Sequence, residues 1–233
     1  MANRPIFIPI GKPANFVKEI SFDFKWNSGF AAVQKKKNIV ALHDAAQKDG
    51  YYPLLEISTK SENEIGQRLS AFNLKIETKL GMFSIESAYQ GSKVFEKGGP
   101  FTDIYQKSSR EAKKDERLRK SGKIIAFDFF GERWPIIPKT AFYDWLYLKA
   151  LQPHQEYLKK RIYEYKGFTD IEFNPKKSIN CQARTCALLV SFLKLDVLDF
   201  ALKSQDIFIG TVFKDSISQK HSVDVRQIDL FQK

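Results

Sequence analysis

The chain has 233 residues, of which 43% are hydrophobic, and its formal net charge is +11 at pH 7. This length allows one large domain or one domain with an extension, and the apolar content excludes wholesale disorder. The excess of Lys and Arg favours a polyanionic partner or substrate, without indicating which polyanion it is.

Residues 1–60 are predicted to form short strands and one helix. In the stretch ISFDFKW, Phe22, Phe24 and Trp26 alternate with polar residues, which is typical of a half-buried strand. The Ala-rich segment 29–50 has helical apolar spacing and ends in glycine, which predicts an amphipathic helix. Further strands are expected at IFIPI and YYPLLEIST. We interpret this region as an N-terminal strand and helix extension packed on the rest of the chain.

Residues 61–233 are predicted to form a mainly helical domain. Apolar residues recur at spacings of three and four from residue 83 onward, with Pro- or Gly-marked turns between the periodic stretches. Helices are expected over residues 84–95, 108–121, 138–150, 153–165 and 180–203. Strands are expected in the last thirty residues. The fold class that follows is α+β, a mainly helical domain with a short-strand N-terminal extension.

The sequence carries no clear signal for a disulfide, a metal site, a cofactor or a membrane segment. Cys181 and Cys186 lie five residues apart on a predicted helix, so we expect two buried thiols and no disulfide. His43, His154 and His221 have no partners at metal-ligand spacing, so we expect no metal and no cofactor. No stretch approaches the roughly 20 apolar residues of a membrane helix, and no signal peptide is recognisable, so we expect a cytoplasmic protein without membrane contact.

The segment FSIESAYQGSK at 83–93 is the strongest candidate for chemistry. Helical spacing puts Glu86, Gln90 and Lys93 on one stripe, beside an apolar stripe that contains Tyr89. A carboxylate in the first turn is often only a helix-start residue, stabilised by the helix dipole. Here the aromatic neighbours and the short polar face favour a site. A partly desolvated carboxylate near a lysine can act as a general base or stabilise positive charge on a sugar ring.

Glycosidic chemistry usually needs a second acid, and FTDIEFNP offers two candidates. On a strand, Asp170 and Glu172 would share one face, although either could be an ordinary surface charge. Trp134 follows an apolar run and precedes a proline. It is either a core anchor, the default for a tryptophan, or a loop side chain that stacks on a nucleobase.

Phosphate and nucleic-acid contacts are expected from basic residues. No nucleophile elbow, P-loop or dinucleotide-binding glycine motif occurs, so Lys, Arg or helix N-termini would hold any phosphate. Basic runs lie at residues 34–38, 110–123 and 174–178, and each is either a solvated surface or a phosphate contact.

The order of these motifs resembles the NADAR family. The motifs that carry the resemblance are LSAF at 69–72, SIESAYQGSK at 84–93, EAKKDERL at 111–118, ERW at 132–134, LKALQ at 148–152, DIEF at 170–173 and NCQARTCALL at 180–189. In front of them, the segments FIPI, WNSGF, QKKKNIVALH and LLEIST are similar to NADAR antitoxins that accompany DarT-type ADP-ribosyltransferase toxins.

This resemblance implies a metal-independent hydrolase that removes ADP-ribose from guanine in DNA or RNA. Residues 61–233 then become a NADAR-like catalytic domain with Glu86 as catalytic glutamate and Asp170 or Glu172 as second acid. The expected partners are ADP-ribosylated nucleic acid, single-stranded DNA in particular, ADP-ribose as product, and the cognate toxin. The substrate-binding residues that we expect are Ser70, Phe72, Asn73, Tyr89, Gln90, Lys93, Trp134, Asn180 and Gln182.

The sequence departs from the family pattern at several positions. The histidine that follows the glutamate is Ser87 here, and the strand asparagine is Ala71 unless Asn73 takes its place. The late helix has Gln182 and Cys186 where the family has its N-x-L-G pattern. The first change removes a polar side chain near the substrate, and the others affect ribose or diphosphate contacts.

Two alternative functions stay open. The first is an N-glycosidase that acts on small phosphorylated ribosyl-amine metabolites. The second is a non-enzymatic module that neutralises a toxin by direct contact or only binds nucleic acid.

Overall fold

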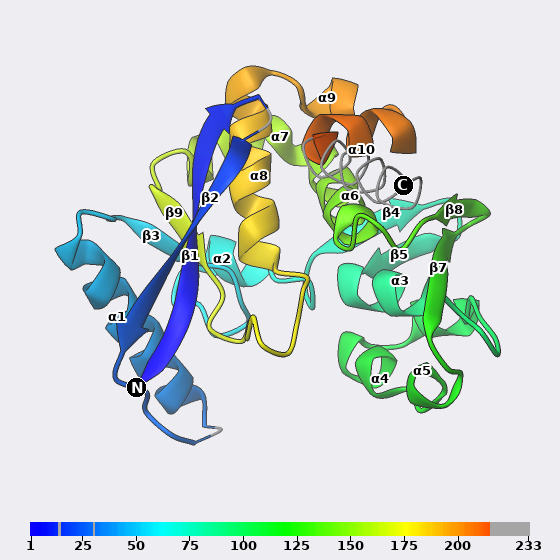
Figure 1. Cartoon of the computed structure of the whole chain (residues 1–233), viewed down its shortest axis with the longest axis horizontal. Helices are drawn as coiled ribbons and strands as arrows, with labels where there is room; N and C mark the ends of the chain where they lie inside the picture. Colours follow the sequence, from blue (N-terminus) through cyan, green and yellow to red (C-terminus); the bar gives the residue numbers. More distant parts are fainter. Residues whose placement is uncertain (14, 30, 215–233) are drawn as a thin grey trace, which may run out of the picture.

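The computed structural model describes residues 1–13, 15–29 and 31–214, which form a mixed α+β structure (Figure 1). The strands are β1 (Ala2–Lys12), β2 (Asn15–Phe24), β3 (Leu54–Glu56), β4 (Lys75–Thr78), β5 (Gly81–Ser84), β6 (Lys93–Phe95), β7 (Ile124–Phe129), β8 (Glu132–Trp134) and β9 (Gly167–Thr169). The helices are α1 (Ala32–Lys48), α2 (Glu64–Arg68), α3 (Ile85–Gly91), α4 (Ser109–Lys114), α5 (Arg117–Lys120), α6 (Ala141–Leu151), α7 (Gln155–Ile162), α8 (Gln182–Leu195), α9 (Leu198–Ala201) and α10 (Gln205–Val212), with 3-10 turns at Thr102–Gln106 and Gln152–His154.

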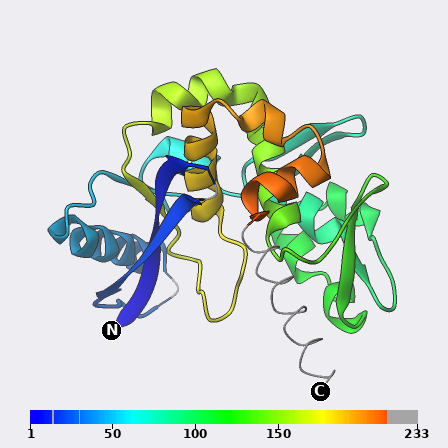
Figure 2. The same ribbon diagram turned by 45° about the horizontal axis from the view of Figure 1, so that its top comes forward.

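The N-terminal hairpin belongs to a four-stranded sheet with the order β2-β1-β9-β3. Strand β1 is antiparallel to both of its neighbours, whereas β3 runs parallel to β9. The two hairpin strands have 11 and 10 residues, so the expectation of only short strands in this region was wrong. A long two-stranded ribbon is stable here because both of its faces are covered, by α1 and by α8 (Figures 1 and 2).

Alternation along the hairpin divides its side chains between two hydrophobic clusters. Phe22 and Phe24 are buried with Ile39 and Leu42 of α1, as the alternating pattern predicts. On β1, Ile6 belongs to the same cluster, whereas the next residue, Phe7, belongs to the main cluster. At the turn end of the hairpin, the ring of Phe16 packs edge-on against Phe192 of α8, with 5.0 Å between ring centroids. The hairpin therefore connects α1 to the main core. The division of the chain into domains at residue 60 stays a prediction.

Several of the predicted elements differ in the structure. The helix expected at 180–203 is divided into α8 and α9, because Asp196 between them adopts a left-handed backbone conformation with a φ of 55°. The helix expected at 84–95 ends at Gly91 because the Gly91 carbonyl accepts a hydrogen bond from Phe101 N, and Lys93–Phe95 pairs with β7 as a strand. The helix expected at 108–121 is divided at Asp115, whose carboxylate accepts from Arg117 N. Residues 205–212 form the Ser204-capped helix α10 instead of strands, and residues 215–233 lie outside the described residues.

Helices α6 and α8 form the centre of the main cluster, and apolar residues surround both. Cys181 and Cys186 are buried and free, which confirms the expectation of two thiols without a disulfide. Among the residues that the structure describes, no helix has the length and apolarity needed to cross a membrane.

Candidate active site

A cleft of about 630 Å³ opens between the loops that leave the four-stranded sheet, the turn after α2 and the helices α3, α4, α6 and α8. The loops contribute Ser58, Thr59, Lys60, Asp170, Glu172, Phe173, Ser178 and Asn180, and α8 contributes its first residue, Gln182. The helices and the turn after α2 contribute Ser70, Ala71, Phe72, Glu86, Gln90, Arg110, Lys113 and Tyr143. A cavity of this size accommodates a ligand of nucleotide dimensions.

The parallel pairing of β3 with β9 explains why distant segments meet at the cleft. Leu54 pairs with Gly167 and Glu56 with Thr169, so both strands end at the same edge of the sheet. Ligand sites in open α/β sheets lie at the carboxyl ends of strands, and the loops after β3 and β9 follow that rule here. The first carries Ser58–Lys60, and the second carries Asp170.

Glu86 lies on α3 with its side chain at the cleft and only 7% of its surface exposed. The Ser84 hydroxyl caps the helix by accepting a hydrogen bond from Ser87 N, which fixes the turn that carries Glu86. Gln90 Nε2 donates to Glu86 Oε1 over 2.9 Å, and Lys93 Nζ donates to Gln90 Oε1 over 2.6 Å. The three residues of the predicted stripe therefore form one hydrogen-bonded chain that ends at the carboxylate.

Tyr89 and Asn180 form a second polar contact beside this hydrogen-bonded chain. Lys93 Nζ lies 4.8 Å from the ring centroid of Tyr89, and burial lowers the pKa of Lys93 to about 8. The Tyr89 hydroxyl accepts a hydrogen bond from Asn180 Nδ2 over 2.8 Å, and burial raises the pKa of Tyr89 to about 12. Asn180 itself lines the cleft, and its Oδ1 has no hydrogen-bond partner among the described residues.

The structure separates the two candidate second acids. Asp170 is 8% exposed at the cleft, and its Oδ1 accepts from Glu172 N over 3.0 Å in a turn after β9. Burial, with the nearby carboxyl of Glu56, raises the pKa of Asp170 to about 8. Glu172 lies on the rim, where it pairs with Lys35 over 3.4 Å. The expectation that the two acids share a strand face was wrong, because β9 ends at Thr169.

A buried network holds the Asp170 turn in place. Glu56 Oε2 accepts from the Thr169 hydroxyl, and Oε1 accepts from Ile171 N. Burial raises the pKa of Glu56, and these two hydrogen bonds oppose that shift. Because Thr169 Oγ1 donates to Glu56, it accepts from His43 Nε2, 2.8 Å away. The Asp170 turn is thereby tied to both β3 and α1.

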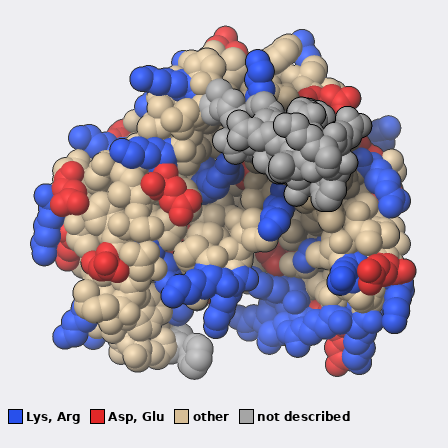
Figure 3. All heavy atoms as spheres, in the orientation of Figure 1, with Lys and Arg blue, Asp and Glu red and all other residues tan. Residues whose placement is uncertain are grey.

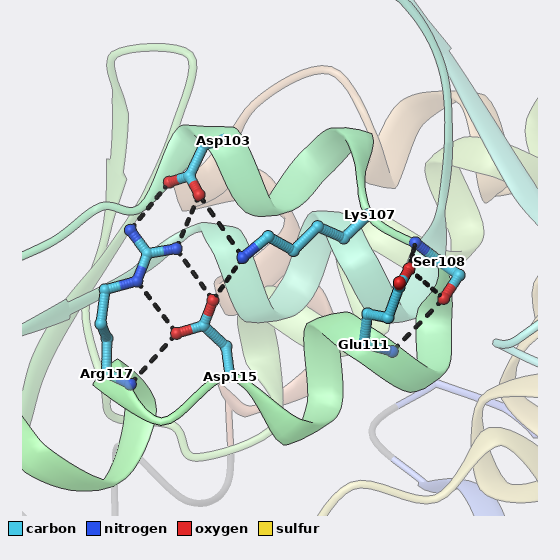
Figure 4. A network of polar contacts seen from close by, with 6 residues as sticks. All are labelled: Asp103, Lys107, Ser108, Glu111, Asp115 and Arg117. Atoms are coloured by element: carbon cyan, nitrogen blue, oxygen red, sulfur yellow. Dashed lines mark hydrogen bonds and ion pairs between the residues drawn. The ribbon is translucent and has the colours of Figure 1, made fainter.

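Some basic residues of 110–123 form ion pairs and others do not. Arg117 of this run, together with Lys107 in front of it, contacts the carboxylates of Asp103 and Asp115, and this network joins the turn before α4 to α5 (Figure 4). The Arg117 guanidinium lowers the pKa of the Asp115 carboxyl. These four residues therefore have a structural role, which the sequence pattern alone did not separate from phosphate contact.

Helix α4 presents two other basic residues to the cleft. A capping box between Ser108 and Glu111 starts the helix (Figure 4). Arg110 and Lys113 line the cleft, and among the described residues neither forms an ion pair. Lys113 Nζ lies 5.3 Å from the ring centroid of Phe72, a predicted site residue. Figure 3 shows Lys and Arg gathered on the surface over α4 and α5.

Four predicted site residues do not line the cleft. Tyr89 and Lys93 lie behind it, as described above, and Asn73 is exposed on the turn after α2, where its Nδ2 donates to Gln67 O. Trp134 is fully buried, so the interpretation as a stacking residue was wrong. Strand β8 directs its ring into the core, 4.9 Å from Trp145 and 5.8 Å from Phe142 between centroids.

The remaining expected residues line the cleft, together with several that the sequence did not indicate. Gln182 Oε1 accepts from Ala71 N over 2.7 Å, so it ties the start of α8 to the turn after α2. Tyr143 was missed because α6 is apolar on all sides, which indicates a core helix. Ser58–Lys60 and Arg110 were missed as individual residues. The position of Ser58–Lys60 directly after a predicted strand was the available signal.

Truncation of Trp134 is predicted to affect stability more than ligand binding. Trp134→Ala removes a fully buried ring and should lower the free energy of unfolding by about 3–5 kcal/mol, measured by urea denaturation. Trp134→Phe should lose less, and the affinity of its folded fraction for ADP-ribose should match that of the original chain. Normal stability of Trp134→Ala together with lost ADP-ribose affinity would instead place the ring in the binding site.

Together, the fold and the site define an α+β protein with a nucleotide-sized cleft whose wall carries three cationic side chains and three carboxyl groups, two of them nearly buried. The chain matches the model of the DarT1-associated NADAR antitoxin family over residues 2–222, and it belongs to this family. The match confirms the resemblance drawn from the motif order and associates the chain with a DarT-type toxin. Comparison with curated proteins gives no match.

Proposed function

We propose that this chain is a hydrolase that removes ADP-ribose from ADP-ribosylated guanine in DNA or RNA, and that it acts in this way as the antitoxin to a DarT-type ADP-ribosyltransferase. The observation that carries the proposal is the position of Glu86, a shielded carboxylate that accepts from Gln90 and faces a cleft of about 630 Å³ whose wall also holds Lys60, Arg110 and Lys113. Family membership supports the antitoxin role.

The reaction is hydrolysis of the N-glycosidic bond between the anomeric carbon of ADP-ribose and guanine. The Glu86 carboxylate positions a water molecule and accepts its proton as the water oxygen bonds to the anomeric carbon. The carbon–nitrogen bond breaks, and its electron pair stays on the guanine nitrogen. Asp170, whose raised pKa keeps it protonated at neutral pH, supplies a proton to the leaving base. The products are free ADP-ribose and unmodified guanine.

The walls of the cleft suit the two halves of ADP-ribose. Lys60, Arg110 and Lys113 provide positive charge for the diphosphate. Asn180 offers an unpaired Oδ1, which can accept from a ribose hydroxyl, and Ser70 lies in the same wall. No set of three or more His, Cys, Asp or Glu side chains suited to a metal ion occurs in the described ranges, and the proposed reaction uses none.

Removing the two unpaired cations of α4 should weaken substrate binding. The Arg110→Ala/Lys113→Ala variant is expected to raise KM by about tenfold or more and to change kcat less. Each of the two substitutions removes one charge-assisted contact to the diphosphate. Steady-state release of ADP-ribose measures both constants. Lys114→Ala, on the same helix but outside the cleft lining, is the matched control. Equal KM values for the double variant and the control would exclude this phosphate site.

The proposal is tested by mixing the purified protein with a guanine-ADP-ribosylated oligonucleotide, without added metal, and measuring free ADP-ribose. Release of ADP-ribose and recovery of the unmodified oligonucleotide are expected. Release only from small phosphorylated ribosyl-amines would identify the metabolite N-glycosidase instead. If no substrate is cleaved but a Glu86→Gln variant still protects toxin-expressing cells, the chain acts as a binding module.

A further inference from the structure

A second groove, of about 510 Å³, lies where the start of β1 meets the loop between β9 and α8 (Figure 1). We refer to it as the N-terminal groove. Arg4 and Trp26 line it from the hairpin, and Asn174 and Lys176 line it from the loop. The segments WNSGF and QKKKNIVALH, which contribute no residue to the lining of the cleft, provide Trp26 and the neighbouring Lys35.

The groove combines an aromatic ring with positive charge. The Arg4 guanidinium carbon lies 5.3 Å from the Trp26 ring centroid, and Lys35 Nζ lies 5.5 Å from it. Arg4 Nη1 donates to Asn3 O, but within the described ranges Arg4 has no carboxylate partner and its Nε has no hydrogen-bond partner. Aromatic rings and guanidinium planes are the surfaces on which unpaired bases stack.

Both walls of the groove are held in place by hydrogen bonds. Asn38, which is fully buried in α1, accepts from Asn27 N and donates to Asn27 O, and so fixes the residue after Trp26. On the other wall, Asn174 Oδ1 accepts from Lys176 N in a tight turn that leaves the Lys176 side chain exposed. A preformed site of this kind loses less entropy when it binds a flexible strand.

The groove and the cleft share the loop between β9 and α8. Phe173 and Ser178 of this loop line the cleft, while Asn174 and Lys176, between them in sequence, line the groove. The pair of Lys35 and Glu172 spans the same boundary, because Glu172 lines the cleft and Lys35 lies over Trp26. The cleft and the groove are therefore separated by this one loop, in which the consecutive residues Phe173 and Asn174 line one each.

We propose that the N-terminal groove binds a nucleotide that flanks the modified guanine in a single-stranded polynucleotide. The Arg4–Trp26 pair stacks on the flanking base, and Lys176 contacts a backbone phosphate. This inference rests on the proposed function and narrows its substrate class to polynucleotides over free nucleotides. A free ADP-ribosylated nucleotide fills the cleft but has no neighbour to place in the groove.

The experiment compares kcat/KM on two substrates, an ADP-ribosylated single-stranded oligonucleotide and ADP-ribosylated guanosine monophosphate. Trp26→Ala is expected to lower kcat/KM on the oligonucleotide by about tenfold, the usual effect of losing one base stack, and to leave the mononucleotide value unchanged. Trp26→Phe should restore most of the loss. Because Phe also restores packing, the unchanged mononucleotide value is the readout that separates stacking from a folding defect.

A double variant tests the charges without altering the ring. Arg4→Met/Lys176→Met should weaken binding of an unmodified oligonucleotide and reduce the salt dependence of that binding by about 0.7 log units per log unit of salt for each lost phosphate contact. Fluorescence anisotropy of a labelled oligonucleotide measures both. Lys160→Met, an exposed residue of α7, is the control. Unchanged oligonucleotide binding in the double variant would overturn the inference, as would equal losses on both substrates in Trp26→Ala.

Failure of the proposed function gives a different result. If the original chain cleaves neither substrate, the glycosidase proposal falls, but the binding comparison still decides whether the groove holds a strand. If it cleaves both and the groove variants change nothing, only the groove inference falls.

Discussion

Glu86→Gln is expected to lower the rate of ADP-ribose release at least about 100-fold, the usual loss when a general base is removed. The substitution keeps the size of the side chain and one acceptor oxygen, so Gln90 Nε2 retains a partner and α3 keeps its place. Affinity for ADP-ribose should therefore change much less than turnover. Single-turnover release from a modified oligonucleotide and calorimetric binding of ADP-ribose measure the two quantities separately.

The matched control is Glu77→Gln, on an exposed position of β4 outside the cleft. It removes the same charge and should leave turnover and affinity unchanged. Turnover of Glu86→Gln at the level of this control would remove Glu86 from the mechanism. A parallel loss of turnover and ADP-ribose affinity would instead assign Glu86 to ground-state binding.

Local spacing was sufficient to predict the polar face of α3. The positions of Glu86 and Gln90 on one helix face follow from the helical period alone, and the observed hydrogen bond between them agrees with that spacing. The end of α3 was not predictable in the same way. It depends on the hydrogen bond from Phe101 N to the Gly91 carbonyl, and Gly91 also packs so closely that an added Cβ would lie 2.5 Å from the Tyr105 ring; both are tertiary contacts without a local signal.

The second wall of the cleft depends on long-range pairing. Ser58–Lys60 meets Asp170 only because β3 pairs with β9, more than one hundred residues later in the chain. Sequence spacing could not distinguish Asp170 from Glu172, because their difference lies in tertiary surroundings. Asp170 is buried beside Glu56, and Glu172 pairs with Lys35 at the rim. Trp134 shows the opposite case, in which the default core interpretation was right and the functional one was wrong.

These surroundings predict different outcomes for the two acids. Asp170→Asn should lower turnover by about 100-fold or more, because it removes a proton donor from the leaving base. Glu172→Gln loses only a rim ion pair and should change turnover by less than about threefold, since exposed pairs contribute little. Equal losses in the two variants, measured as release from the modified oligonucleotide, would contradict this assignment.

The pH dependence provides an independent test of Asp170. Its folded-state pKa of about 8 lies above the ordinary value for an aspartate, about 3.9, because burial and Glu56 disfavour its ionised form. Activity that needs the protonated acid should therefore fall as the pH rises through about 8, and Asp170→Asn should lack this decrease.

The raised pKa of Asp170 also predicts that the stability of the fold decreases as the pH rises. The folded chain binds this proton more tightly than the unfolded chain, so the free energy of unfolding should fall as the pH rises from about 4 to about 8. Asparagine cannot ionise, so the variant should have a shallower slope and should gain stability relative to the original chain as the pH rises; the remaining slope comes from Glu56, whose pKa burial also raises. Urea denaturation across this range measures the slope, and an unchanged slope in Asp170→Asn would show that Asp170 is ionised in the folded chain and cannot be the proton donor.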